Sequence, residues 1–177
     1  MRLSGYGFFQ AFWLFVSLVY TRLFFSKARI VRLPFFLRQI GVFEVGVNFS
    51  CGYFNRVDVF RGAHLTIGDN FQMNDSCHIA CAEDVVIGDD VLIASRVFIS
   101  DHDHRIPDIG QSPLTSGLDT AKVSIGSRVW LGEGVCILKG VTIGDDVVVG
   151  ANSVVTKDIP SGTVCVGAPA RIIKHRL

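Results

Sequence analysis

Two imidazoles and two carboxylates alternate at residues 101–104, in the segment Ser100-Asp101-His102-Asp103-His104. Near neutral pH, a neutral imidazole can take a proton from a hydroxyl group, and a neighbouring carboxylate can fix the imidazole's tautomer. The pattern therefore predicts general-base chemistry. We expect His102 to be the base, with His104 as its rival, and either Asp101 or Asp103 to orient it.

These residues open a segment that interrupts a regular repeat. An aliphatic residue recurs every six positions over residues 67–99 and again over 125–155, with one slip of two residues between 79 and 87. The 25 residues 100–124 contain no hexad. A long loop that leaves a regular scaffold usually carries function. We therefore expect residues 100–124 to protrude from a repetitive body and to hold the chemistry.

The repeat itself predicts the body. Its first position is the aliphatic residue and its fifth is a second apolar residue, such as Phe71, Val91 or Val129. Gly often takes the second position, which suits a corner where a side chain would clash or the backbone angle is unusual. The spacing lacks the 3.6-residue period of a helix. It predicts an all-β solenoid of stacked strands, each about three to five residues long.

Residues 1–43 form a different kind of segment from residues 44–177. They hold six basic and no acidic residues, and 12 of the 19 aromatic residues of the chain. As a helix, the apolar run 8–20 would be about 20 Å long, short of the roughly 30 Å core of a bilayer. Aromatic and basic side chains together suit the membrane interface. We expect a helical arm in peripheral contact with a membrane. The alternatives are packing on the body or on a neighbouring subunit and, as the least favoured, a true membrane span.

Composition argues against several other kinds of site. The five cysteines form no CxxC pair, which speaks against a metal site and fits a reducing compartment. The arm is too aromatic and apolar for a flexible nucleic-acid-binding tail, so no nucleic-acid partner is expected. His64, His78 and His175 stand alone, and we expect structural or solvent-exposed roles for them.

Three further segments carry a family resemblance: Val129-Trp130-Leu131-Gly132, residues 150–160 and residues 166–171. With the tandem hexads, they resemble the hexapeptide-repeat acyltransferases over roughly residues 45–174. The resemblance implies a left-handed parallel β-helix that works as a homotrimer. Within the family, residues 29–34, 73–75 and 93–104 are most similar to the O-acetyltransferases of lipopolysaccharide O-antigen synthesis.

The resemblance also implies the donor and the residues that would hold it. Acetyl-CoA would be the acetyl donor, with no metal required. Family positions that contact the donor match a small set of residues in this chain: Glu133, Ala151, Thr156, Lys157, Arg171 and Lys174. Ala151 would line the channel for the pantetheine arm, while Thr156, Lys157, Arg171 and Lys174 would lie near the nucleotide.

The remaining implied roles concern the reaction and the acceptor. The resemblance places the catalytic imidazole at His102 and sets Trp130 beside the transferred acetyl group. Asn74 matches an acceptor-contacting position, and Asp103 is a second candidate for the acceptor. Relatives carry a carboxylate about eight residues after that Asn, where this chain has Ala82. This departure leaves the identity of the sugar open.

Together these features predict an acetyl-CoA-dependent O-acetyltransferase that modifies a sugar hydroxyl of a surface-polysaccharide precursor. The acceptor would be a carbohydrate, with a lipid-linked form as one option. The enzyme would be cytoplasmic and associated with the inner face of the plasma membrane, with active sites between subunits. One alternative is a small-molecule acetyltransferase acting on a free sugar, an amino-acid hydroxyl or an antibiotic. The other is a non-catalytic or zinc-binding, hydratase-like hexapeptide-repeat protein.

Overall fold

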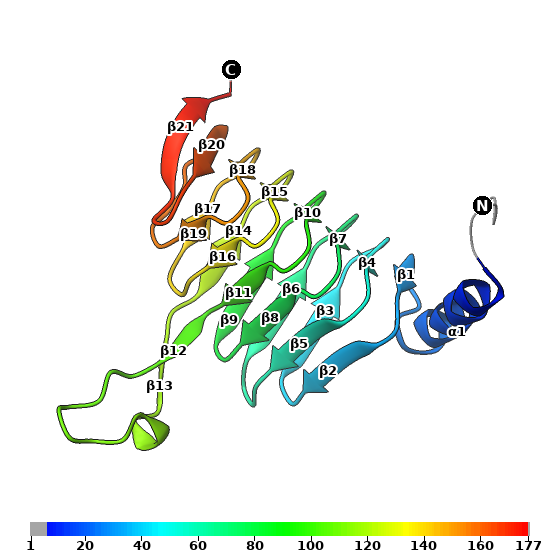
Figure 1. Ribbon diagram of the computed structural model, residues 1–177, viewed down its shortest axis with the longest axis horizontal. Helices are drawn as coiled ribbons and strands as arrows, with labels where there is room; N and C mark the ends of the chain where they lie inside the picture. Colours follow the sequence, from blue (N-terminus) through cyan, green and yellow to red (C-terminus); the bar gives the residue numbers. More distant parts are fainter. Residues whose placement is uncertain (1–6, 177) are drawn as a thin grey trace.

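The chain folds into one N-terminal helix followed by a parallel β-helix, as Figure 1 shows. The computed structural model describes residues 7–176. Residues 1–6 and Leu177, which the expected arm (1–43) and domain (44–177) include, lie outside the described residues. The predicted all-β solenoid class is confirmed.

Three sheets form the faces of the solenoid, and all their pairings are parallel except the last pair, β20 with β21. Sheet 1 stacks β1 (Ile30–Val31), β4 (Ser50–Cys51), β7 (Gln72–Met73), β10 (Leu92–Ile93), β15 (Trp130–Leu131), β18 (Val148–Val149), β20 (Thr163–Val166) and β21 (Arg171–His175). Sheet 2 stacks β2 (Phe35–Gln39), β5 (Asn55–Val59), β8 (His78–Cys81), β11 (Phe98–Ser100), β16 (Cys136–Ile137) and β19 (Val154–Val155). Sheet 3 stacks β3 (Val42–Val45), β6 (His64–Ile67), β9 (Asp84–Ile87), β14 (Val123–Ile125) and β17 (Thr142–Ile143). Many strands are shorter than the expected three to five residues, because corners take up the rest of each hexad.

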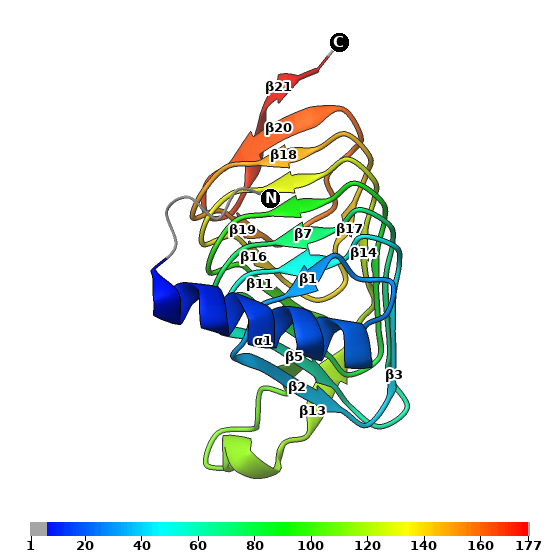
Figure 2. The same ribbon diagram turned by 90° about the vertical axis from the view of Figure 1, so that its right-hand side faces the viewer.

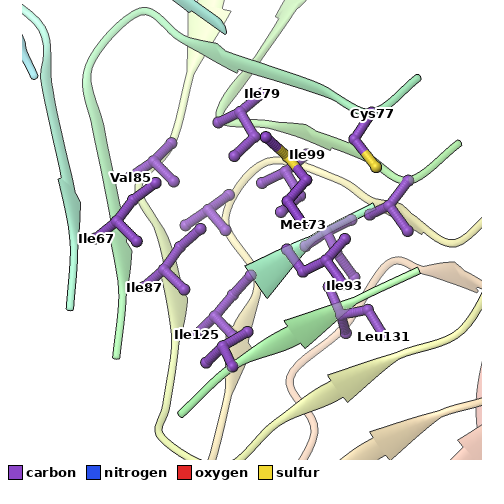
Figure 3. Packing of buried hydrophobic residues seen from close by; sticks show 14 of the residues in the cluster. Ile67, Met73, Cys77, Ile79, Val85, Ile87, Ile93, Ile99, Ile125 and Leu131 are labelled. Carbon is purple, nitrogen blue, oxygen red and sulfur yellow. The ribbon is translucent and has the colours of Figure 1, made fainter. Parts of the chain in front are cut away.

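The predicted inward positions form the core. Side chains at the first hexad position stack above one another between the three sheets, as the labelled isoleucines of Figure 3 show. At the fifth hexad position, Phe49 and Phe71 form a separate aromatic column, with nearly parallel rings 5.5 Å apart. Fully burying one such side chain contributes about 1.5–3 kcal/mol, so the stack of coils supplies most of the stabilisation.

The corners show which of the two expected reasons explains the glycines. A Cβ at Gly126 or Gly144 would collide with the corner of the next coil. The unusual backbone angle falls two residues later instead, with φ of 57° at Arg128 and 59° at Asp146. Glycine is therefore required here for close stacking of corners, and not for a positive φ.

The arm is helical over α1 (Phe8–Phe24), as predicted, and it crosses the N-terminal end of the solenoid (Figures 1 and 2). Ser17 and Thr21 face the first coil, where their hydroxyl oxygens accept the N–H groups of Leu33 (3.1 Å) and Val31 (2.8 Å). In the described part of the chain, no helix is long and apolar enough to cross a membrane.

The first coil begins earlier than the expected boundary at residue 43. Strands β1, β2 and β3 already contribute one strand to each sheet, so the β-helix starts at Ile30. The hexad pattern misses this coil, because residues 30–45 lack the regular aliphatic spacing. Phe25 closes the end, with its ring stacked on Phe49 at 6.3 Å.

Candidate active site

The interruption of the repeat leaves the solenoid at one corner, between sheet 2 and sheet 3. Strand β12 (His102–His104) pairs antiparallel with β13 (Leu118–Thr120), and this hairpin carries the 3-10 turn η1 (Pro113–Thr115) away from the body (Figure 1). The expected protruding loop is therefore present. His102 lies where the hairpin meets the body and is largely buried, whereas the far end of the loop is exposed.

Asp101 fastens the base of the hairpin to the coil below. Its carboxylate is fully buried and accepts three backbone N–H groups. Oδ1 accepts from Ala82 at 2.8 Å, and Oδ2 accepts from Glu83 at 2.7 Å and Asp84 at 2.9 Å. The three N–H donors replace the hydrogen bonds to water that the carboxylate loses on burial.

The same carboxylate orients His102. The Nδ1 atom of His102 lies 2.9 Å from Asp101 Oδ1. An ionised carboxylate can only accept hydrogen bonds, so Nδ1 carries the ring proton and Nε2 keeps its lone pair. Of the two carboxylates that the sequence left open, Asp101 is the one in contact with His102. This arrangement can take a proton at Nε2 while Asp101 stabilises the resulting imidazolium.

Two neighbours that the sequence did not single out also hold His102. The hydroxyl of Ser100 accepts the His102 N–H at 3.2 Å and donates to the His102 carbonyl at 2.8 Å. The ring of Phe60, from the corner after β5, packs edge-on against the imidazole at 5.3 Å. No sequence signal identifies Phe60, because it lies 42 positions earlier and outside the regular hexads.

The hairpin has a second attachment through Lys139, on the coil above. The Lys139 ammonium donates to Asp119 and lies 3.7 Å from Asp103 Oδ2. The hydrogen bond from Lys139 lowers the pKa of Asp119, and the same bond raises the pKa of Lys139. Asp103 therefore contacts Lys139 rather than His102.

The other predicted catalytic and acceptor residues lie elsewhere in the same chain. His104 is exposed on β12. Trp130 is half-exposed on β15 in sheet 1, and Asn74 lies at the corner between sheets 1 and 2. Asn74 lines a groove of about 540 Å³ together with Arg32 and Tyr53. A single chain therefore does not bring Trp130 or Asn74 next to His102.

Four of the predicted donor-binding residues border sheet 2 in the C-terminal coils. Glu133 and Ala151 occupy successive corners on the sheet 1 side, and Thr156 and Lys157 occupy a corner on the sheet 3 side. Glu133 pairs with Arg96 at 2.6 Å. Arg171 and Lys174 lie exposed on β21 at the C-terminal end of sheet 1. Their roles toward a donor remain predictions.

Between those two edges, the outer face of sheet 2 changes character along the stack. One row of outward side chains is paired strand to strand: Phe36, Arg56, His78, Phe98, Cys136 and Val154. Its N-terminal members include cationic and polar groups, whereas the last three are apolar. The chain leaves sheet 2 at the end of β11 and continues to His102. Phe98, on β11, is the first of the three apolar residues in this row.

Residues 7–176 offer less for a metal site or a cysteine nucleophile. No group of three or more metal-ligating side chains comes together there. All five cysteines are free thiols, and burial raises the pKa of Cys51 and Cys81 to about 12 and that of Cys77 to about 11. These three thiols stay protonated near neutral pH and are poor nucleophiles.

Comparison with known proteins identifies the class. The family model of the bacterial transferase hexapeptide (six repeats) matches residues 122–157. WbbJ of Escherichia coli (strain K12), named for O-acetyl transfer in lipopolysaccharide biosynthesis, is 47% identical over 163 residues, which cover 87% of this chain and 82% of WbbJ. The chain therefore belongs to the hexapeptide-repeat transferase family. Within that family it is an acetyltransferase, as its relatives are by name.

Two further matches are to longer proteins. Galactoside O-acetyltransferase of Escherichia coli (strain K12) is 42% identical over 114 residues, which cover 64% of this chain and 55% of that protein. A solved structure of galactoside acetyltransferase in complex with coenzyme A superposes with a TM-score of 0.56 at 31% identity, covering 80% of this chain and 64% of the other. The chain thus spans between half and two thirds of these two proteins.

Proposed function

We propose that this protein transfers the acetyl group of acetyl-CoA to a sugar hydroxyl of a surface-polysaccharide precursor, with His102 as general base. The observation that carries the proposal is the buried Asp101–His102 pair at the base of the hairpin. Similarity to WbbJ supports the acceptor class, and the coenzyme A complex of galactoside acetyltransferase supports the donor.

The reaction follows from the tautomer of His102. Nε2 accepts the proton of the sugar hydroxyl while the oxygen attacks the thioester carbonyl of acetyl-CoA, and a tetrahedral intermediate forms. The C–S bond then breaks, and the imidazolium returns its proton to the CoA thiolate. Asp101 stabilises the imidazolium throughout. The products are the O-acetyl sugar and CoA, so no group on the protein becomes acetylated.

The outer face of sheet 2 suits the donor. Its apolar C-terminal row, Phe98, Cys136 and Val154, offers a surface for the pantetheine arm and ends at the strand that leads to His102. Ala151 on one edge leaves space for the arm, and Lys157 on the other offers a cation for a phosphate. This direction brings the acetyl end of the donor toward His102.

A complete site needs a second subunit in this proposal. Trp130 and Asn74 lie on sheet 1 and its corner, away from the His102 corner of the same chain. In a homotrimer, sheet 1 of one subunit would face the hairpin and sheet 2 of its neighbour. Trp130 would then line the acetyl-transfer site, and the groove around Asn74 would face the acceptor.

The helical arm gives the enzyme a surface for membranes. Helix α1 packs through Leu14, Ser17 and Thr21, which leaves its other faces exposed. Large apolar side chains project from those faces: Phe8, Phe9, Phe12, Trp13, Phe15, Val19, Leu23 and Phe24. With basic residues nearby and no acidic residue in the arm, this face suits the cytoplasmic side of an anionic bilayer. Such contact would bring the enzyme to a lipid-linked acceptor.

The proposal is tested with purified trimer, acetyl-CoA and polysaccharide precursors isolated from cells that lack the gene. CoA release is followed with a thiol reagent. His102→Ala should lower kcat by about 10²–10⁴-fold, the usual contribution of a general base. His104→Ala is the matched variant and should have a much smaller effect. Near-normal turnover by His102→Ala would remove His102 from the mechanism, and loss of activity only in His104→Ala would assign the base to His104.

A further inference from the structure

A cluster of charged side chains lies on sheet 2, on the N-terminal side of His102. At its centre is Asp58, whose side chain is 4% exposed. Its Oδ1 is 3.1 Å from Arg38 Nε, and its Oδ2 is 2.7 Å from Arg56 Nε and 3.0 Å from His78 Nε2. Three cationic or polar groups from three successive coils thus converge on one carboxylate, and none of them takes part in the chemistry described above.

Asp58 keeps its charge in this setting. Burial acts to raise its pKa, but the hydrogen bonds from Arg56 and His78 and the charges of both arginines outweigh burial, so the pKa is lowered. One carboxylate therefore balances two guanidinium groups, and the cluster keeps a net positive charge. Among residues 7–176, neither Arg38 nor Arg56 pairs with any other carboxylate.

The arginines present their remaining donors to solvent. Each guanidinium has five N–H donors, and Nε is the atom nearest Asp58 in both. The two side chains are 52% and 53% exposed although Asp58 beneath them is buried. They border an open groove of about 550 Å³, lined by Phe35, Phe36, Leu37, Arg38, Arg56 and Asp58. A buried carboxylate that holds two guanidinium groups at Nε leaves their terminal N–H groups facing solvent. Such planar pairs of N–H donors suit the oxygens of phosphate groups.

The cluster is connected to the proposed reaction centre. Arg38, Asp58, Ala80 and Ser100 are successive partners across sheet 2, and Ser100 holds the backbone of His102. Neighbouring strands are about 4.8 Å apart, so Asp58 and Ser100 are separated by roughly 10 Å along the sheet. Phe60 lies between the two sites, with the Arg38 guanidinium 5.0 Å from its ring and His102 at 5.3 Å.

We propose that Arg38 and Arg56 form a subsite for a phosphate or diphosphate that the acceptor sugar carries at its reducing end. The apolar row of sheet 2 suits the donor on the C-terminal side of His102, and the arginines suit an anionic acceptor on the N-terminal side. The sugar would span the interval between them and bring a hydroxyl to His102. This inference rests on the proposed function, since it names the chemical class of the same acceptor. A nucleotide sugar and a lipid-linked sugar diphosphate share this chemistry.

Binding of inorganic pyrophosphate to the full-length protein, measured by calorimetry at saturating CoA, tests the subsite. Saturating CoA occupies the donor's own phosphate contacts. Arg38→Gln/Arg56→Gln should weaken binding by about tenfold or more, since charge-assisted hydrogen bonds are lost at both side chains. Arg128→Gln is the matched control: Arg128 is 52% exposed and paired with Asp145 and Asp146 on another edge of the solenoid. Equal pyrophosphate affinity of the double variant and the wild type would overturn the subsite. So would a wild-type protein that binds no pyrophosphate at saturating CoA.

Further measurements guard against misfolding and identify the source of the phosphate. Arg38→Lys/Arg56→Lys keeps the charge beside Asp58 and should fold, while losing the planar forks and part of the affinity. UDP-glucose and a polyprenyl diphosphate glucose in detergent are titrated separately, and the one that binds more tightly, in an arginine-dependent manner, identifies the source. Binding of neither would overturn the proposal. His102→Ala should still bind pyrophosphate, so failure of the catalytic assignment and failure of the subsite give different results.

Discussion

Replacing Asp101 by Asn changes one oxygen into an NH₂ group at a position with four donors around it. The carboxylate accepts backbone N–H groups from Ala82, Glu83 and Asp84, and the Nδ1 proton of His102. An amide oxygen can serve only one side. If the amide oxygen takes the place of Oδ2, it still accepts the N–H groups of Glu83 and Asp84, and the NH₂ group points toward Ala82 and His102. If the amide oxygen takes the place of Oδ1, the N–H groups of Glu83 and Asp84 lose their acceptor.

The first orientation is the cheaper one, and it blocks the base. Only the Ala82 N–H is then orphaned, which costs about 1–3 kcal/mol. His102 can accept from the new NH₂ group by moving its proton to Nε2, the atom that must be free to take the hydroxyl proton. We therefore expect Asp101→Asn to lower Tm by roughly 2–12 °C, given about 2–4 °C per kcal/mol for a chain of this size. We expect kcat to fall by about 10²–10⁴-fold, as for His102→Ala.

The assay combines CoA release under saturating substrates with a thermal melt of the same preparation. Asp89→Asn is the control, because Asp89 also accepts a backbone N–H, from Asp69 at 2.7 Å, but lies at a corner remote from the hairpin. Asp101→Asn/His102→Ala should be no slower than either single variant, since both act on one unit. A folded Asp101→Asn enzyme with kcat within threefold of wild type would refute the tautomer argument, as would additive losses in the double variant.

Three further predictions concern stability and location. Phe49→Ala should lower the free energy of unfolding by about 3–5 kcal/mol in a denaturant titration, because it opens a cavity in the aromatic column; a loss below 1 kcal/mol would mean that the column does not support the end of the solenoid. Because the folded protein lowers the pKa of Asp58, this carboxylate stabilises the fold at pH values above its ordinary pKa of 3.8, and the stabilisation is lost as pH falls through the lower folded pKa. Asp58→Asn should therefore reduce the dependence of the free energy of unfolding on pH in the acid range. An unchanged dependence on pH would contradict this. Phe12→Ser/Phe15→Ser should lower the fraction of protein that co-sediments with anionic vesicles without changing Tm, because both side chains are exposed. An unchanged fraction would exclude this face of α1 as the membrane contact.

The body of the fold could be predicted because it is a local repeat. Ile67, Ile93 and Ile143 are buried at the first hexad position for a reason visible within six residues of each. The first coil was not predicted, because Ile30–Val31 and Phe35–Gln39 depend on pairing with strands about 20 residues later. Strand pairing over such separations leaves no short-range period in the sequence.

The candidate site divides in the same way. The hairpin that carries His102 could be located, because the repeat stops there. The choice between Asp101 and Asp103 could not be made, since it depends on N–H groups of the preceding coil and on Lys139 of the following one. The cluster around Asp58 was missed for the same reason: Arg38 and His78 are each 20 residues from Asp58 in the sequence and meet it only through strand register.

The acetylation state of the surface polysaccharide tests the central claim most directly. Cells lacking the gene are complemented with the wild-type chain or with His102→Ala at matched protein levels, and the polysaccharide is examined by proton NMR for O-acetyl methyl signals. We predict O-acetyl groups with the wild type and their absence with His102→Ala. Equal O-acetylation in the two strains, or no acetyl signal that depends on the gene, would contradict the proposed function.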